Sequence, residues 1–282
     1  MMIRLSDKAF AKVNLSLDIV GRREDGYHLL RSVMQTVSLF DDISVTVSEG
    51  DGIEIICSEP GVPTDEKNTC YKAAKLFIAA AGVNHTKVII EIAKKIPSMA
   101  GLGGGSADAA AVLRILNRSF GNVLGADSLI LLASKVGADV PFLINGGTAL
   151  CEGIGEKLTA LRPLSKQYLL LIKPDIGVST PEAYRAFDEG YFSSAMATDR
   201  LVAAIESGED ISEYIANDLE RAVNIPQIEN LHRLILENGA KASLMTGSGS
   251  CVYGLFDSEA DCRRAYEALH NDYCFAKVCE TI

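Results

Sequence analysis

The residues best suited to chemistry form a glycine-rich segment, Ala100-Gly101-Leu102-Gly103-Gly104-Gly105-Ser106. Alternating apolar residues over 87–93 predict a strand before it, which Pro97 ends because proline has no N–H to donate. A helix with Asp108 in its first turn is expected directly after the glycines. Glycines allow positive φ and leave N–H groups accessible, and a helix N-terminus attracts anions. Strand, glycine loop and helix in this order predict a phosphate-binding site.

Two common nucleotide motifs do not fit this loop. A Walker A loop requires Gly-Lys followed by Ser or Thr, whereas this loop ends in Gly105-Ser106-Ala107. A dinucleotide fingerprint counted from Gly101 requires glycine at the position of Ser106. For the loop considered alone, a turn that binds nothing remains the alternative.

Lys12 and Asn14 form a second candidate pair. Apolar and polar residues alternate over 11–19, which predicts a strand with one apolar and one polar face. The two side chains then stand about 7 Å apart on the polar face. A solvent-exposed strand face is the alternative interpretation.

Tyr27 and His28 directly follow a turn signal, Asp25-Gly26. An aromatic pair at a turn can stack on a nucleobase and hydrogen-bond to its edge. The alternative is a tyrosine that closes the hairpin beside an exposed histidine.

Asp139 precedes Pro141 by two residues, which predicts a helix N-cap. A carboxylate in that position would be held rigidly and kept ionised, so this interpretation and a catalytic role are compatible. A second glycine-serine segment, Thr246-Gly247-Ser248-Gly249-Ser250, is either a hairpin turn or a wall that closes over a ligand.

The elements that position these residues begin with a β-rich N-terminal part. Strands are expected at 11–20, 32–40, 43–47 and 53–57, with Asp41-Asp42 as a turn. A helix over 69–81 follows, capped by Asn68 and ended by Gly82. Later in this part we expect a helix over 127–136 and a short strand over 148–152.

The character of the chain changes at a linker over 159–166, so we place a domain boundary near residue 160. Beyond it we expect strands at 168–172, 242–245, 252–256 and 274–279, and helices at 181–188, 211–222, 228–237 and 259–270. Without the additional helices this order is the β-α-β-β-α-β of a ferredoxin-like unit. The polar segment 189–210 is expected to be an irregular surface excursion.

Composition narrows the function classes. The chain has 282 residues, 48% of them hydrophobic, which is sufficient for one large domain or two ordinary ones. The seven cysteines contain no CxxC pair, which favours reduced thiols in a cytoplasm. A net charge of −10 argues against a nucleic-acid partner. No apolar run is long enough for a membrane span, and the N-terminus has no apolar signal core.

Four stretches occur in an order and spacing that resembles the GHMP kinases: AKVNLSLDIVGRREDGYH, PSMAGLGGGSADAA, GADVPFLINGGTAL and TGSGS. Within this family they are similar to the branch that uses ATP to phosphorylate the 2-hydroxyl of a diphosphocytidyl-linked methylerythritol, in non-mevalonate isoprenoid biosynthesis. The resemblance implies a two-domain α+β fold. An N-terminal ribosomal-S5-like domain (1–160) and a C-terminal ferredoxin-like domain (161–282) would hold the active site in the cleft between them.

The resemblance also implies roles for single residues. Lys12 and Asp139 would be the catalytic pair, in which Asp139 takes the proton of the acceptor hydroxyl and Lys12 keeps Asp139 ionised and offsets phosphoryl charge. Gly103 to Ser106 would cradle the ATP phosphates, with Ser106 as a Mg²⁺ contact.

The remaining implied contacts are with ATP and the acceptor. The ATP site would further include Asn68, Thr69, Pro97, Ala100, Gly101 and Leu102. Acceptor contacts would come from Asn14, Tyr27, His28, Tyr184, Gly247 and Ser248, with Tyr27 and Tyr184 on either side of the cytosine. ATP and Mg²⁺ would be the cofactors of a monomeric or homodimeric cytoplasmic enzyme without nucleic-acid or membrane partners.

Three other interpretations compete with this one. A GHMP kinase of the homoserine or mevalonate type has no reason for an aromatic base clamp, so Tyr27, His28 and Tyr184 argue against it. A non-catalytic nucleotide-binding homologue would be expected to have lost Lys12 or Asp139. A nucleic-acid-binding S5-like module is disfavoured by the net charge of −10.

Overall fold

The computed structural model of the protein describes residues 2–190, 196–223 and 225–282. This part of the chain forms two compact units, and β1 (Ile3–Arg22) and β2 (His28–Glu49) run through both. Unit 1 consists of the residues up to Ala11, Leu39–Ser98 and Gly103–Gly146, and unit 2 of Lys12–Ser38, Met99–Leu102 and Gly147–Ile282. The domain boundary near residue 160 stays a prediction, and residues 147–160 lie in unit 2.

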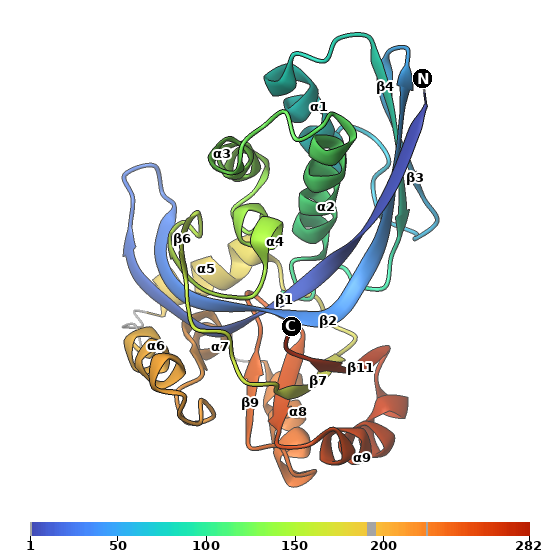
Figure 1. Ribbon diagram of the computed structural model, residues 1–282. Coiled ribbons are helices and arrows are strands. Elements are labelled where there is room, and N and C mark those ends of the chain that lie inside the picture. The colour runs from blue at the N-terminus through green and yellow to red at the C-terminus, as the bar shows by residue number, and fades with distance from the viewer. Residues whose placement is uncertain (1, 191–195, 224) are drawn as a thin grey trace. The chain divides into compact units, whose positions relative to one another are not determined.

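Unit 1 is a sheet covered by helices. Its strands follow the order β3 (Gly52–Cys57), β4 (Thr86–Ala93), β2, β1. The helices are α1 (Thr69–Ala81), α2 (Gly104–Ser119), α3 (Ala126–Val136) and α4 (Val140–Asn145). Figure 1 shows α1 and α2 side by side. As predicted, Asn68 caps α1 and Gly82 ends it in the left-handed conformation, with φ of 65°.

Unit 2 contains a four-stranded antiparallel sheet with the order β11 (Phe275–Glu280), β7 (Tyr168–Lys173), β10 (Val252–Phe256), β9 (Ala242–Met245). Buried residues of α8 (Pro226–Glu237) and α9 (Glu259–Leu269) pack against it. Figure 1 shows both helices beside this sheet. The chain order β7, α8, β9, β10, α9, β11 confirms the ferredoxin-like unit.

Three further strands of unit 2 join the sheet that contains β1 and β2. β5 (Thr148–Gly153) pairs with the first part of β2, and β6 (Lys157–Ala160) pairs with β5. β8 (Ala216–Asn217) pairs in parallel with β1 at Ser16 and Leu17. The remaining elements are α5 (Thr180–Glu189), α6 (Thr198–Ser207), α7 (Asp218–Ala222) and the 3₁₀ turn His270–Asp272. Among the described helices, none has the length and apolar character that a membrane span requires.

Three local predictions were wrong. Asp41 and Asp42 do not form a turn, because β2 continues through them. The helix expected over 211–222 begins only at Asp218, since the two residues before it pair with β1 as β8. The segment expected to be irregular contains α6, while its residues 191–195 lie outside the described part. The carboxylate of Asp18 accepts from the N–H groups of Ala197 and Thr198 where α6 begins, at 3.1 and 2.9 Å.

Candidate functional site

The glycine loop has the backbone conformation that its composition predicts. Gly101 and Gly103 adopt φ of 71° and 70°, and α2 begins immediately after Gly103. The N–H of Ala107 donates to the Gly103 carbonyl at 2.8 Å. The amides of Gly104, Gly105 and Ser106 precede this bond and have no partner inside the helix. These three amides form the positive end of α2, which can receive a phosphate.

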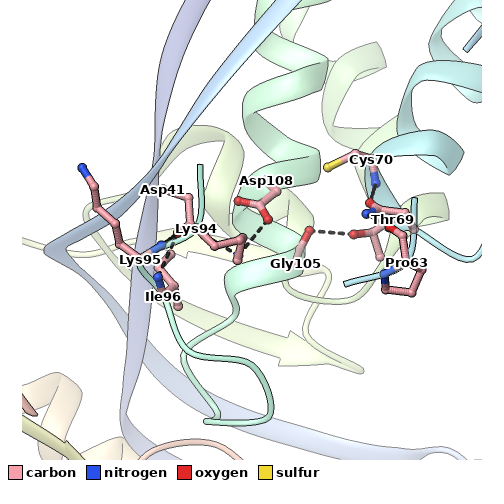
Figure 2. Close-up of polar contacts among 10 residues, drawn as sticks. Asp41, Pro63, Thr69, Cys70, Lys94, Lys95, Ile96, Gly105 and Asp108 are labelled. Carbon is pink, nitrogen blue, oxygen red and sulfur yellow. Dashed lines mark hydrogen bonds and ion pairs between the residues drawn. The ribbon is translucent and has the colours of Figure 1, made fainter. Parts of the chain in front are cut away.

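Thr69, the first residue of α1, supports this loop (Figure 2), and Asn68 caps the same helix. The Thr69 hydroxyl donates to the Gly105 carbonyl at 2.8 Å. The Asn68 side chain accepts from the Cys70 N–H at 2.8 Å and donates to the Pro63 carbonyl at 2.6 Å. Both residues therefore have a structural function beside the loop. Their contact with a nucleotide stays a prediction.

A buried charge cluster lies beside the start of α2 (Figure 2). The Lys94 ammonium donates to the carboxylates of Asp41 and Asp108, at 2.8 Å for Asp108, and these three side chains are at most 7% exposed. Asp41 also accepts from the backbone N–H groups of Lys95 and Ile96, at 2.8 Å for Ile96. Asp41 thus fixes the chain between β4 and Pro97.

The position of Asp108 in α2 differs from the prediction. It lies one turn into α2, which begins at Gly104, so it does not serve as a first-turn charge at the helix end. Its Oδ1 atom is buried without a hydrogen-bond partner in the described structure. Burial raises the pKa of Asp108 to about 7; Lys94 opposes this rise and Asp41 adds to it. Burial acts to lower the pKa of Lys94, but the two carboxylates outweigh it and raise that pKa.

This cluster predicts a pH dependence of stability. The pKa of Asp108 is about 7 in the folded protein against an ordinary value of 3.8, so the native state binds more protons between these values. The free energy of unfolding should then fall as pH rises through this window, by at most about 1.4 kcal/mol per pH unit. Asp108→Asn should lack this contribution and become more stable relative to the wild type as pH rises. Urea unfolding of both proteins at about pH 5 and about pH 7 measures the difference between their free energies of unfolding. The same difference at both pH values would contradict this prediction.

Lys12 and Asn14 lie on β1 in unit 2, and the polar face that carries them is buried. The Lys12 ammonium donates to Asn14 Oδ1 at 2.6 Å. The Asn14 N–H donates to the Thr246 hydroxyl at 3.0 Å, which connects the pair to the second glycine-serine segment. The alternative of a solvated strand face is therefore wrong.

The second glycine-serine segment packs against Gly101. A Cβ atom at Gly101 would lie 1.9 Å from the carbonyl oxygen of Thr246, so only glycine fits there. The Thr246 hydroxyl donates to the Gly101 carbonyl at 3.3 Å, and Gly247 adopts φ of 56° beside it. Ser248 exchanges a hydrogen bond with Thr180 at 2.9 Å. Substrate contacts of Gly247 and Ser248 stay a prediction.

The aromatic residues form a pair different from the predicted one. The rings of His28 and Tyr184 stack with centroids 4.7 Å apart and an interplanar angle of 17°, whereas Tyr27 is 62% exposed. The His28 Nε2 atom lies 2.7 Å from Asp188 Oδ1, and Arg22 pairs with the other oxygen at 3.2 Å. Sequence reasoning missed Asp188, although its place four residues after Tyr184 puts both on one helix face. A sandwich of Tyr27 and Tyr184 around a base stays a prediction.

Asp139 and Ser106 belong to unit 1. Asp139 occupies the N-cap position of α4, as predicted, but its side chain does not make the capping hydrogen bond. A Cβ atom at Gly137 would lie 3.9 Å from the Ser106 hydroxyl, so Ser106 lies beside the segment that leads to Asp139. Among the described residues no three His, Cys, Asp or Glu side chains gather as a metal cluster.

Comparison with known proteins identifies the class. The model of the GHMP kinases N terminal domain matches residues 68–147, and that of the GHMP kinases C terminal region matches residues 201–274. The chain belongs to the GHMP kinase family, which confirms the two-domain α+β fold.

More specific likenesses lie within this family. The chain is 43% identical over 281 residues to the 4-diphosphocytidyl-2-C-methyl-D-erythritol kinase of Clostridium botulinum strain Eklund 17B, covering 98% of this chain and 99% of that protein. A crystal structure of 4-(cytidine 5'-diphospho)-2C-methyl-D-erythritol kinase has a TM-score of 0.82 and 34% identity, with coverage of 98% and 99%. Homoserine kinase from Cytophaga hutchinsonii has a TM-score of 0.73 over 100% and 94% of the two chains at 20% identity, a likeness of fold alone.

Proposed function

We propose that this protein transfers the terminal phosphoryl group of ATP to the 2-hydroxyl of 4-diphosphocytidyl-2-C-methyl-D-erythritol. The products are the 2-phosphate and ADP, and the reaction serves non-mevalonate isoprenoid precursor biosynthesis. The observation that carries this proposal is the 43% identity to a kinase of that name over 98% of the chain. The aromatic residues and the glycine loop supply the chemistry that such substrates require.

Phosphoryl transfer depends mainly on positioning and on charge stabilisation. In this proposal Asp139 accepts the proton of the acceptor hydroxyl as the oxygen attacks the terminal phosphorus of ATP. Lys12 offsets the negative charge on the transferred group, and its ammonium is oriented by Asn14 at 2.6 Å. The bond between the terminal phosphorus and the bridging oxygen breaks, and ADP leaves.

The nucleotide phosphates would bind at the amides of Gly104, Gly105 and Ser106, where the N-terminus of α2 is positive. Ser106 is half-buried, and its hydroxyl oxygen fits a hard cation. Mg²⁺ is typically held by one or two protein groups together with substrate phosphates, so a cluster of carboxylates is not required. Bound Mg²⁺ would neutralise charge on the phosphates.

The cytidine end of the acceptor would bind at Tyr27, His28 and Tyr184. Asp188 accepts a hydrogen bond from His28 Nε2 at 2.7 Å, which fixes the orientation of the imidazole ring beside Tyr184. Exposed Tyr27 offers a face on which a base can stack. These groups favour a cytidyl acceptor over homoserine or mevalonate, neither of which has a base to stack.

A coupled ADP-release assay tests the proposal with the cytidyl acceptor and with homoserine and mevalonate as controls. We expect turnover with the cytidyl acceptor alone. Turnover with a control acceptor instead would retain the kinase class and reject the cytidine site. ATP binding without turnover on any acceptor would favour the non-catalytic homologue.

A further inference from the structure

A chain of hydrogen bonds extends from Lys12 into the buried sheet of unit 2. The Lys12 ammonium donates to Asn14 Oδ1 at 2.6 Å, and Asn14 Nδ2 donates to the Ser32 hydroxyl at 2.8 Å. The Ser32 hydroxyl in turn donates to the backbone carbonyl of Ser16 at 2.5 Å. Asn14 and Ser32 are each 1% exposed, so water does not compete for these bonds.

The direction of this chain is fixed at its buried end. A backbone carbonyl can only accept, so the single hydrogen of the Ser32 hydroxyl points to Ser16. The lone pairs of Ser32 then face Asn14, which must present its NH₂ group to them. The amide oxygen of Asn14 is thereby directed to Lys12. A flipped amide would place the Asn14 NH₂ group against the Lys12 ammonium and the Asn14 oxygen against the Ser32 oxygen.

The backbone at both ends of the chain is held in place. The N–H of Asn14 donates to the Thr246 hydroxyl at 3.0 Å, and its carbonyl accepts from the Tyr253 hydroxyl at 3.1 Å. The hydroxyl of Ser16 accepts from the Val33 N–H at 3.1 Å. With the backbone fixed, the rotation of the Asn14 amide is decided by Ser32.

We infer that Ser32 is a positioning residue that orients the Lys12 ammonium through the amide of Asn14. This inference rests on the proposed function in assigning Lys12 to the transferred phosphoryl group. Without the Ser32 hydroxyl, the Asn14 NH₂ group is buried without an acceptor, and its oxygen is no longer held toward Lys12. The ammonium then loses the fixed acceptor that directs it at 2.6 Å, which should lower kcat.

The test is a double-mutant cycle of Ser32→Ala and Asn14→Ala. Ser32→Ala should lower kcat about tenfold, the size expected for losing the fixed direction of one charge-assisted hydrogen bond, with KM for ATP unchanged. In the Asn14→Ala background, Ser32→Ala should change kcat little, because the amide that transmits its effect is gone. Full kcat in Ser32→Ala, or two effects that multiply in the double variant, would overturn the inference.

Ser38→Ala is the matched control. Ser38 lies on β2 six residues after Ser32, and its hydroxyl accepts from the Glu280 N–H at 3.0 Å. The control should lose stability in thermal unfolding like Ser32→Ala but keep full kcat. Should Ser32→Ala fail to fold, Ser32→Cys retains a weak donor and acceptor and should still lower kcat. Full kcat in a folded Ser32→Cys variant would then overturn the inference.

An NMR measurement separates this inference from the proposed acceptor. The side-chain NH₂ protons of Asn14 should exchange slowly with solvent in the wild type and faster in Ser32→Ala, whichever acceptor the enzyme uses. An enzyme without turnover on the cytidyl acceptor would reject the proposed function, while changed exchange would still support the orientation of Asn14 by Ser32. Equal exchange in both proteins would overturn that orientation.

Discussion

Replacing Asp139 with asparagine is expected to lower kcat at least about 100-fold while ATP binding is retained. The proposed function gives Asp139 the proton of the acceptor hydroxyl, and an asparagine amide cannot accept a proton at that step. The predicted nucleotide contacts come from α2, the glycine loop before it and the start of α1, and do not involve this carboxylate, so the affinity for ATP should persist. Single-turnover kinetics with the cytidyl acceptor, together with calorimetric titration of ATP, measures both quantities.

Asp127→Asn provides the matched control, since Asp127 is an exposed acid in the first turn of α3. It makes the same chemical change near a helix N-terminus and should leave kcat unaltered. If Asp139→Asn retained most of its turnover, Asp139 would not be the base. A loss of ATP affinity equal to the loss of kcat would instead indicate a misfolded loop.

Gly101→Ala is expected to have the largest effect on stability. A Cβ atom there would lie 1.9 Å from the Thr246 carbonyl oxygen, at φ of +71°, so the second glycine-serine segment has to move. Left-handed strain and overpacking together should destabilise the fold by about 3 kcal/mol or more. Turnover should fall as well, because Thr246 also accepts from the Asn14 N–H. Urea unfolding and the ADP-release assay measure the two effects.

Gly121→Ala separates strain from packing. Gly121 has a nearly identical φ of +68°, but a Cβ atom there meets nothing within 4 Å. This control should lose only about 1 kcal/mol, the cost of the left-handed conformation, and keep its turnover. Equal destabilisation by the two substitutions would show that contact with Thr246 does not matter.

Local signals in the sequence were sufficient for much of the fold. The glycines around 101–105, the Asn68 cap and the Gly82 stop act within a few residues, so the loop and the starts and ends of its helices could be predicted. The same holds for the ferredoxin-like unit, because the apolar residues of its strands and helices recur with the periods typical of each element. The motif spacing also identified the family, because the order of motifs is a property of the chain itself.

Other features depend on partners that are distant in the sequence. Asp41 and Asp42 resemble a turn locally, but β2 continues through them and pairs with β4 from Asp42 onward. Lys94 and Lys95, in the segment after β4, form ion pairs with the two carboxylates. From Lys12 to Asp18 the polar residues of β1 alternate as on an exposed strand, yet they are buried. Alternation of polar and apolar residues distinguishes the two faces of a strand, but it does not show whether the polar face is exposed to solvent.

The sequence by itself identified the family and supplied the candidates for a phosphate-binding loop and for the catalytic residues. Only the tertiary structure decided how these residues are held: Lys94 between two buried carboxylates, His28 on Asp188, and Asn14 directed by Ser32. The physical reason is that buried polar groups need hydrogen-bond partners, and folding supplies them from segments that the sequence keeps far apart.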